Sequence, residues 1–585
     1  MSHFRFLFRY LAKYKFSYLL GTIFIVLTNW IAVTIPGYLK LCIDLLSEST
    51  ETLDTNKDQL LTYLLIMFAL ALCIIVVRTL SRVFFFNPGR AIEYEIKNDL
   101  FQKLTFLQKK FYDNNATGAI ISKIQNDING VRMICGFGMM QVFNIATALS
   151  FAPFKMWQLS PDLTLYTILP IIVVFIIIRF SMHFVVRYTR ERMVTLQKIS
   201  GFIVSSLTGI DVIRAYNINN LTSERFEKTN HELKQHSLRI SFFRSFFMPI
   251  LHNLENILKV IVLWFGGSMV IRASLSIGEL TAFIAYLALL TTPIMGLGWL
   301  TTIFQTGVLG IASLMTIFNE TTPEAEARPL PAAVRTRLFN HGLVIKNLSH
   351  AYPDHDEPVL KDISFSILPN QTVGILGKIG SGKTTLVNCL NRYLPIDEQQ
   401  VFLGQHDLCD LSLADVRSVI HTVSQDVFLF SDTIENNIRF GTELIQRADP
   451  QDLAIVIHES DLTEDIHRFP EGIHTIVGEK GIMLSGGQKQ RISLARALMT
   501  PCDLLILDNV LSAVDYETER ILLEHIHKRR TARSLLIVSH RVQALEQADL
   551  IIVLDEGRIV DQGSHQSLIQ RAGLYRETWE LQQYQ

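Results

Sequence analysis

The stretch Gly377-Lys378-Ile379-Gly380-Ser381-Gly382-Lys383-Thr384 decides the fold of the second half of the chain. It follows the apolar run Val373–Leu376 and precedes a helical pattern at 385–393, which is the strand, loop and helix order of a phosphate-binding P-loop. Glycines let backbone amides curl around phosphate oxygens, and the N-terminus of the next helix adds positive potential. In this pattern Lys383 reaches the β- and γ-phosphates and Thr384 ligates magnesium. We therefore predict that residues 377–385, Thr385 included, bind a nucleotide.

A strand that ends in a carboxylate lies further along the chain. The apolar run Leu504–Leu507 is followed by Asp508, and a P-loop site requires such a second group to organise magnesium. Similar β-rich runs alternate with helical patterns at Thr372–Leu376, Leu535–Val538 and Leu550–Leu554. This alternation predicts an α/β domain with a largely parallel sheet, which we place at residues 338–585.

Between these elements stands the sequence Leu484-Ser485-Gly486-Gly487-Gln488, followed by a helical run at 489–499. It resembles the signature motif of ABC ATPases, and further motifs follow in that family's order. The resemblance implies ATP and Mg²⁺ as cofactors, adenine stacking on Tyr352 and a switch role for His540. The residues that the resemblance places at the nucleotide are Tyr352, Gly377, Lys378, Ile379, Gly380, Ser381, Gly382, Lys383, Thr384, Thr385, Ser485, Gly486, Gly487, Gln488 and the D-loop residue Asp515. The metal ligands that it implies are Thr384, the Q-loop residue Gln425 and Asp508. The catalytic positions that it implies are Gln425, Asp508, Asn509 and His540.

The first half of the chain is apolar enough to cross a membrane. Of all 585 residues, 49% are apolar and 19% are charged, and the mean hydropathy is +0.27. A bilayer core of about 30 Å requires about 20 mostly apolar residues in a helix. Six stretches are long enough, and we predict a helical membrane domain at 1–319 and a Pro- and Ala-rich linker at 320–337. The predicted spans are 16–36, 60–80, 136–157, 163–184, 249–270 and 279–300.

Charge distribution predicts the orientation of these spans. Lys and Arg concentrate before the first span and in the connections 85–135 and 185–245, whereas the loop 44–58 is acidic. Since short cytoplasmic loops retain cations, we expect the N-terminus, both long connections and the ATPase domain in the cytoplasm of a multi-pass inner-membrane protein. We also expect the spans to continue as long helices beyond the bilayer. The net charge of −1 offers no argument for nucleic acid as a partner.

Six spans followed by an ABC ATPase in one polypeptide resemble the half-transporters that include multidrug and lipid exporters. The segments Phe428–Thr433 and Val477–Gly481 resemble the bacterial multidrug resistance-like group called the MdlA type. Phe111–Tyr112 and Gly209–Tyr216 resemble the family's cytoplasmic connections. The resemblance implies short coupling helices there, placed against the ATPase surface near 428–433.

One residue departs from the family pattern. Active members carry glutamate after the Walker B aspartate, whereas this chain has Asn509. An amide does not accept a proton at neutral pH, so we expect a degenerate, poorly hydrolytic site. Because the signature 484–488 is intact, we predict a heterodimer in which this signature completes the active site of a second, non-identical half-transporter.

The sequence does not identify the substrate. We expect an amphipathic small molecule, and His252, Asn253, Glu255 and Asn256 in the fifth span either line its path or lie in water below the bilayer. A lipid flippase, an importer and an ATP-gated or regulatory subunit remain as alternatives. The N-terminal 15 residues, which lack a cleavage site, predict an amphipathic surface helix.

Overall fold

The computed structural model describes residues 3–47, 57–115, 117–321, 330–352, 357–441, 450–478, 484–510, 516–529 and 532–583. The chain forms two compact units. One comprises Met1–Leu107 and Asn114–Glu320, and the other comprises Gln108–Asp113 and Thr321–Gln585. We refer to them as the membrane unit and the ATPase unit.

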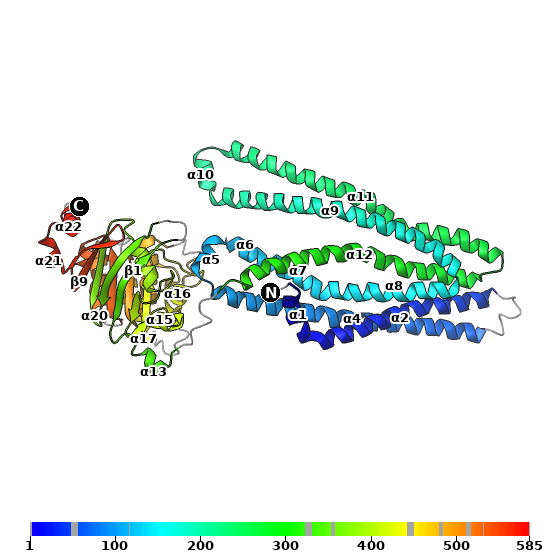
Figure 1. Ribbon diagram of the computed structural model, residues 1–585, viewed down its shortest axis with the longest axis horizontal. Coiled ribbons are helices and arrows are strands. Elements are labelled where there is room, and N and C mark those ends of the chain that lie inside the picture. The colour runs from blue at the N-terminus through cyan, green and yellow to red at the C-terminus, as the bar shows by residue number, and fades with distance from the viewer. Residues whose placement is uncertain are drawn as a thin grey trace. The chain divides into compact units, whose positions relative to one another are not determined.

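The membrane unit consists of helices, several of them very long (Figure 1). Two short π-helical segments, Lys123–Asp127 and Ile134–Gly138, flank α7 and continue into α8. The helices are α1 (His3–Leu11), α2 (Lys15–Leu46), α4 (Lys57–Thr105), α5 (Lys109–Asn114), α6 (Thr117–Ser122), α7 (Ile128–Met133), α8 (Met139–Leu159), α9 (Pro161–Thr208), α10 (Ile210–Ala215), α11 (Asn219–Ile271) and α12 (Ile277–Phe318), with α5 divided between the two units.

Large apolar side chains cover the outside of these helices. On α4, Leu65, Phe68 and Ile75 are all exposed, Phe68 by 65%. Exposed contiguous apolar surface of this kind is compatible with lipid and unfavourable in water. Within the described residues, five helical segments are long and apolar enough to cross a membrane: Arg5–Leu46, Lys57–Thr105, Thr117–Leu159, Asn253–Ile271 and Ile277–Phe318.

The predicted fourth span, 163–184, lies within α9. Its described apolar part is Pro161–Val173, and several side chains between 174 and 186 lie outside the described residues. The predicted class, a helical membrane domain joined to an α/β domain, is confirmed. The acidic loop that we expect to face outward lies largely outside the described residues, at 48–56.

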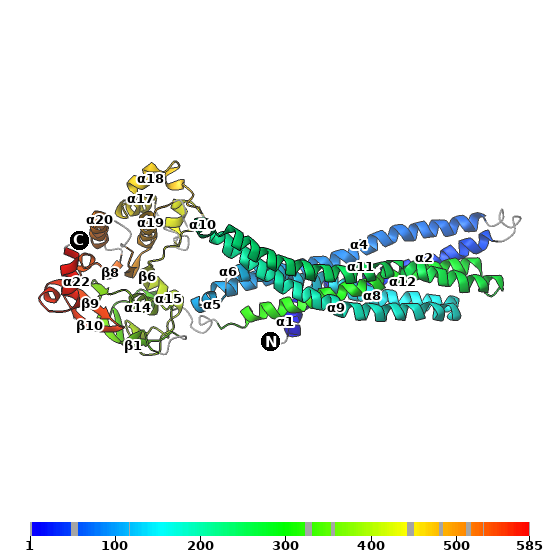
Figure 2. The same ribbon diagram turned by 90° about the horizontal axis from the view of Figure 1, so that it is seen from above.

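Helices α9 and α11 extend far beyond a bilayer thickness. They contain 48 and 53 residues, which correspond to about 70–80 Å at the usual helical rise. They run side by side, and the six-residue helix α10 joins their ends (Figures 1 and 2). The predicted long extensions are therefore present, and the segments predicted as coupling helices coincide with the short helices α5 and α10.

Polar contacts join α2 to the start of α12. The Lys40 ammonium lies 2.9 Å from a carboxylate oxygen of Glu279, and the Gly278 N–H donates to Asp44 Oδ1 at 3.1 Å. Gly278 permits this approach, because a Cβ atom there would lie 2.7 Å from the Asp44 carboxyl carbon. At the N-terminus of the chain, the buried Tyr10 side chain of α1 donates to Asp99 on α4 at 2.7 Å.

The ATPase unit contains two sheets. A six-stranded sheet has the order β10-β9-β3-β8-β7-β6, and a four-stranded antiparallel sheet has the order β2-β1-β4-β5. All neighbours in the larger sheet are parallel except β9 and β10. The strands are β1 (Leu343–His350), β2 (Leu360–Ile367), β3 (Thr372–Gly377), β4 (Val401–Leu403), β5 (His406–Asp407), β6 (Ile420–Val423), β7 (Cys502–Asp508), β8 (Ala532–Ser539), β9 (Leu550–Asp555) and β10 (Arg558–Gly563).

The helices of the ATPase unit cover both faces of the larger sheet. They are α13 (Ala332–Arg335), α14 (Lys383–Leu390), α15 (Leu413–Val419), α16 (Ile434–Arg439), α17 (Pro450–Glu459), α18 (Thr463–Arg468), α19 (Gly486–Met499), α20 (Tyr516–Arg529), α21 (His565–Ile569) and α22 (Leu574–Gln583). Short α13 lies inside the predicted linker, of which residues 322–329 are outside the described part.

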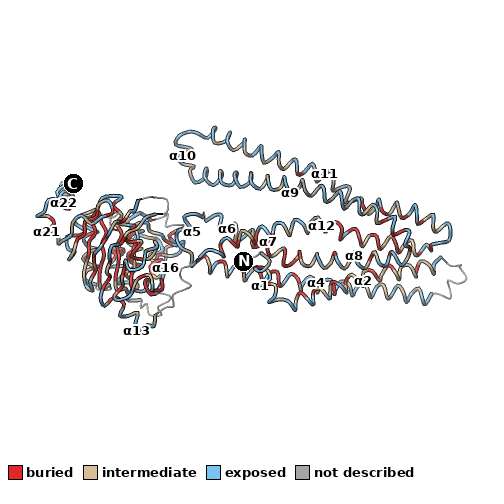
Figure 3. Tube along the Cα trace, in the orientation of Figure 1, coloured by how far each residue is buried: buried red, intermediate tan, exposed pale blue. Residues whose placement is uncertain are grey.

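Alternate residues of the central strands enter two separate cores. On β7, Leu505 and Leu507 belong to one apolar cluster, and Leu504 and Ile506 belong to the other. A parallel sheet buried on both faces therefore explains the uninterrupted apolar run of this strand. Buried residues accordingly concentrate in the ATPase unit, whereas the long helices are mostly exposed (Figure 3). The carboxyl ends of β3, β8, β7 and β6 lie at the same edge of the sheet, because these neighbouring strands are parallel.

Candidate nucleotide-binding site

The P-loop connects the end of β3 to the start of α14, as its sequence predicts. Gly380 and Gly382 have φ values of +85° and +99°, which glycine adopts without steric cost. The Lys383 ammonium donates to the carbonyl oxygens of Gly377 and Lys378 at 2.7 and 2.8 Å. The loop therefore curls around the side chain that is predicted to bind the β- and γ-phosphates.

The loop also contains a buried hydroxyl. Ser381 is 3% exposed, and its Oγ atom has no hydrogen-bond partner within the described residues. A buried polar atom without a partner is unfavourable, so this hydroxyl is a fitting donor for an oxygen of a bound phosphate. The residues of the loop thus fit a nucleotide.

Asp508 and Thr384 come together at the carboxyl end of the sheet. Asp508 is 2% exposed, and burial raises the pKa of its carboxyl, while the hydrogen bond from Thr384 and the charge of Lys383 partly oppose that rise. For Lys383, burial lowers the pKa of the ammonium and the charge of Asp508 counters this effect. Carboxylate and hydroxyl oxygens are ligands that Mg²⁺ prefers, so this pair fits the predicted metal position.

Asn509 follows Asp508 in a left-handed backbone conformation. Its φ is +52°, and its N–H donates to the Val538 carbonyl at 2.9 Å. Asparagine adopts this conformation more readily than most other residues. The position is thus held by the neighbouring strand β8, directly beside the predicted metal ligand.

His540 and Gln425 follow the neighbouring strands β8 and β6. Burial lowers the pKa of the His540 imidazole, and the charges of Lys383 and Arg541 lower it further, which favours the neutral ring. Gln425 is exposed two residues after β6. Because β8, β7 and β6 are adjacent and parallel, both residues lie at the same edge of the sheet as Asp508.

Tyr352 lies next to the helix that follows the P-loop. Its hydroxyl is 3.2 Å from Thr385 Oγ1, and its ring packs edge-to-face on His350 with centroids 5.3 Å apart. A partly exposed ring beside the P-loop helix can stack on a base. The structure therefore brings the predicted adenine-binding residue to the phosphate site.

The signature forms the N-terminus of α19. Ser485 Oγ accepts from the Gln488 N–H at 3.2 Å, and Gln488 Oε1 accepts from the Ser485 N–H at 2.9 Å. The Gln488 amide also donates to Asp465 at 2.8 Å. This reciprocal capping box uses the N–H groups of Ser485 and Gln488, and it places those of Gly486 and Gly487 at an anion-favouring helix end. The predicted D-loop residue Asp515 and the segment 479–481 lie outside the described residues.

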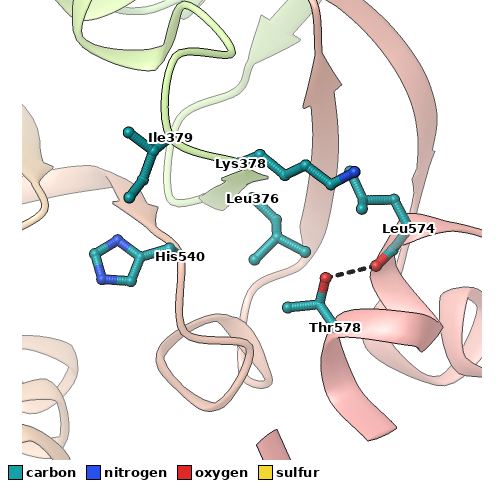
Figure 4. A pocket seen from close by; sticks show the side chains of 7 residues that line it. Leu376, Lys378, Ile379, His540, Leu574 and Thr578 are labelled. Atoms are coloured by element: carbon teal, nitrogen blue, oxygen red, sulfur yellow. Dashed lines mark hydrogen bonds between the residues drawn. The ribbon is translucent and has the colours of Figure 1, made fainter. Parts of the chain in front are cut away.

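Two residues near the P-loop were not predicted. Leu574 and Thr578 of α22 line a pocket of about 430 Å³ together with Lys378, Ile379 and His540 (Figure 4). In this view His540 and Ile379 lie on one side of the pocket, and the two α22 residues lie on the other. The C-terminal helix contains no recognisable motif, so no local signal indicates its proximity to the P-loop.

The polar residues predicted in the fifth span lie on α11. Glu255 pairs with Lys259 at 2.7 Å and accepts from the Thr291 hydroxyl of α12 at 3.4 Å. Asn256 donates to Asn253 at 3.3 Å. The side chain of His252 lies outside the described residues. A role of these residues in a substrate path stays a prediction.

Comparison with known proteins shows the family to which the chain belongs. Residues 18–294 match the model of the ABC transporter transmembrane region, and residues 360–512 match that of the ABC transporter family. The chain is 32% identical to the probable multidrug resistance ABC transporter ATP-binding/permease protein YheI of Bacillus subtilis, over 97% of this chain and 96% of that protein. It is 30% identical to the multidrug resistance-like ATP-binding protein MdlA of Escherichia coli, over 90% and 88% of the two chains. The predicted resemblance to that group is confirmed.

A solved structure shares the whole architecture. The structure of a bacterial Atm1-family ABC exporter with ATP bound has a TM-score of 0.83 and 22% identity, over 97% of this chain and 99% of that chain. At this identity the match establishes the fold. Together with the two curated relatives, it identifies the chain as a multi-pass membrane protein with an ABC ATPase domain that belongs to the ABC transporter family.

Proposed function

We propose that this protein is one half of an exporter that moves amphipathic small molecules across the cytoplasmic membrane at the expense of ATP, with its ATPase unit in the cytoplasm. The observation that carries the proposal is the grouping of Lys383, Thr384 and Asp508 at one sheet edge, in a chain with lipid-compatible helices. The names of YheI and MdlA support multidrug compounds as the substrate class.

Each part of the site has a defined task in this proposal. Lys383, the P-loop amides and the Ser381 hydroxyl bind the phosphates, and Tyr352 orients the base. Thr384, Gln425 and Asp508 hold Mg²⁺, which when bound neutralises phosphate charge. In the proposed dimer, the helix N–H groups of Gly486 and Gly487 and the Ser485 hydroxyl bind the nucleotide of a second half-transporter. The D-loop residue Asp515 is assigned to nucleotide binding as well. Closure of two such units around ATP changes the arrangement of the membrane helices.

Asn509 makes this chain's own site a weak hydrolase in the same proposal. It orients water but does not accept a proton, and loss of a general base costs about 10² to 10⁴ in rate. An intact signature beside a degenerate site favours a heterodimer with a partner that carries glutamate at this position. The partner's site would then supply most of the turnover.

The experiment compares ATP hydrolysis by the purified chain alone and after co-expression with a candidate half-transporter that carries this glutamate. We expect slow turnover alone, a large increase with the partner, and an increase for Asn509→Glu alone. Glutamate in a left-handed conformation costs about 1–2 kcal/mol, so thermal unfolding of the variant is measured in parallel. Brisk turnover by the chain alone that Asn509→Glu does not change would contradict the degenerate site.

Transport is tested in proteoliposomes with a fluorescent amphipathic cation and, separately, with a labelled phospholipid. We expect accumulation of the cation that requires both ATP and Mg²⁺ and proceeds against its gradient. Movement of the phospholipid without the cation would favour the flippase. Passive, nucleotide-gated flux of either probe would contradict an exporter.

A further inference from the structure

The C-terminal helix α22 holds the backbone that carries His540. The side-chain amide of Gln582 donates to the His540 carbonyl oxygen at 2.7 Å, and its oxygen accepts from the Val542 N–H at 2.8 Å. Gln582 thereby binds the two peptide groups on either side of Arg541. Two good hydrogen bonds from one side chain to residues 40 and 42 positions earlier in the sequence restrict this segment strongly.

Other contacts also hold this segment. The Arg541 guanidinium pairs with the buried Glu519 of α20 at 2.6 Å, and the Arg541 N–H donates to Ser539 Oγ at 2.9 Å. The Arg541 N–H and the His540 carbonyl belong to one peptide group, which Ser539 and Gln582 therefore hold together, whereas Gln582 accepts from the Val542 N–H in the peptide group after Arg541. Val542 is fully buried, so loss of the acceptor for its N–H would be costly.

His540 lies where its orientation affects the phosphate site. Its ring lines the pocket with Gly377, Lys378 and Ile379 of the P-loop, as Figure 4 shows. Lys383 is close enough for its charge to act on the imidazole, and in a P-loop that lysine binds the β- and γ-phosphates. A rotation of the backbone at His540 would therefore move its ring relative to the terminal phosphate.

We propose that Gln582 is a positioning residue that holds His540 toward the γ-phosphate of bound ATP and thus makes the C-terminal helix part of the nucleotide site. This inference rests on the proposed function, because it requires that the P-loop bind MgATP. The inference predicts that substitution of Gln582 weakens the binding of ATP selectively. ADP lacks the γ-phosphate, so Gln582 contributes to the affinity for ATP and not to that for ADP.

The experiment measures equilibrium binding of MgATP and MgADP to the purified full-length chain. We expect Gln582→Leu to weaken ATP binding about three- to tenfold, which is the usual range for one hydrogen bond, and to change ADP binding less than twofold. Gln582→Glu still accepts from Val542 but places an acceptor oxygen against the His540 carbonyl oxygen, so it should also lose ATP affinity selectively, and it carries the test if Gln582→Leu does not fold. The matched control is Gln583→Leu on the exposed face of the same helix.

A double-mutant cycle separates positioning from general damage. His540→Ala should weaken ATP binding, and adding Gln582→Leu or Gln582→Glu to it should have no further effect, because the residue that Gln582 positions is then absent. Equal loss of ATP and ADP affinity, an unchanged ATP to ADP ratio, or additive effects in the cycle would overturn the inference. Failure of the unmodified chain to bind MgATP would instead overturn the proposed function.

Discussion

The ammonium group of Lys383 donates a 2.7 Å hydrogen bond to the carbonyl oxygen of Gly377, the last residue of β3. The positive charge that is predicted to bind phosphate therefore lies against carbonyl oxygens of its own loop. We expect Lys383→Ala to weaken MgATP binding about 10- to 100-fold, because hydrogen bonds to charged groups contribute about 1.5–3 kcal/mol. Lys361→Ala is the control, since its ammonium makes a 3.7 Å pair with the exposed Glu357. Unchanged affinity in Lys383→Ala would contradict the assignment of the P-loop.

Substitution of Tyr352 should weaken the binding of ATP and ADP alike. Its ring lies beside α14 and should stack on adenine, which ATP and ADP share. We expect Tyr352→Ala to weaken binding of both nucleotides about tenfold, in line with about 1–3 kcal/mol for stacking of a base on an aromatic ring. Tyr352→Phe keeps the ring and should bind normally, although it lacks the hydroxyl next to Thr385. A selective loss of ATP binding, or equal losses in both variants, would argue against stacking.

A substitution at Ser485 distinguishes this chain's own nucleotide site from the partner's site that its signature is proposed to complete. Ser485→Ala removes the acceptor for the Gln488 N–H, at a cost of about 1 kcal/mol to the helix. We expect the chain's own MgATP affinity to stay unchanged, whereas ATP hydrolysis by the assembled transporter should fall. Ser564→Ala removes an N-cap from α21 and serves as the control for a general capping effect. Loss of hydrolysis in both variants would assign the effect to stability.

The pair formed by Arg335 and Asp415 predicts a pH-dependent anchor for the start of the ATPase unit. The fully buried Asp415 accepts from Arg335 and from the Leu330 N–H, each at 2.9 Å. Burial alone would raise the pKa of Asp415, but the Ser412 hydroxyl, the Leu330 N–H and the Arg335 guanidinium hold it below its ordinary value of 3.8. A lowered folded-state pKa means that the stabilisation is complete above about pH 4 and is lost as the pH falls through the folded pKa.

We therefore expect Asp415→Asn to weaken this anchor by about 1–3 kcal/mol at pH 7. Hydrogen exchange of a peptide that covers residues 330–337, measured on the full-length chain, should become faster. The difference from the unmodified chain should shrink as the pH is lowered below 4. Glu357→Gln, an exposed surface charge, is the control. A difference that grows toward low pH would contradict this role of Asp415.

Short sequence motifs were sufficient to single out the residues that we expect to bind nucleotide. The P-loop and the signature each lie within a few consecutive residues, because a single turn and the following helix N-terminus create their function. The strand ends at Asp508 and His540 were also predictable, since parallel strands read as continuous apolar runs. Their convergence needed the strand order, in which β8 lies between β3 and β7.

Contacts between distant segments were not predictable. Gln582 is an ordinary glutamine near the end of the C-terminal helix, and neither its neighbours in the sequence nor any periodicity indicates that it binds residues 540 and 542. The same holds for Asp415, whose sequence context does not indicate that it binds Leu330 and Arg335. Such side-chain contacts arise from the packing of whole elements, which single-sequence patterns do not encode.

By itself, the sequence determined that this chain has a helical membrane part and a P-loop ATPase part, and which residues resemble those that bind nucleotide. Hydropathy and short motifs are sufficient for this, because they act over one helix or one loop. The tertiary structure alone decided that the Ser381 hydroxyl has no hydrogen-bond partner in the described part of the chain, that Asp508 meets Thr384, and that α22 reaches the backbone of His540. These relationships depend on burial and on contacts across the sheet edge, and they form only when distant segments pack together.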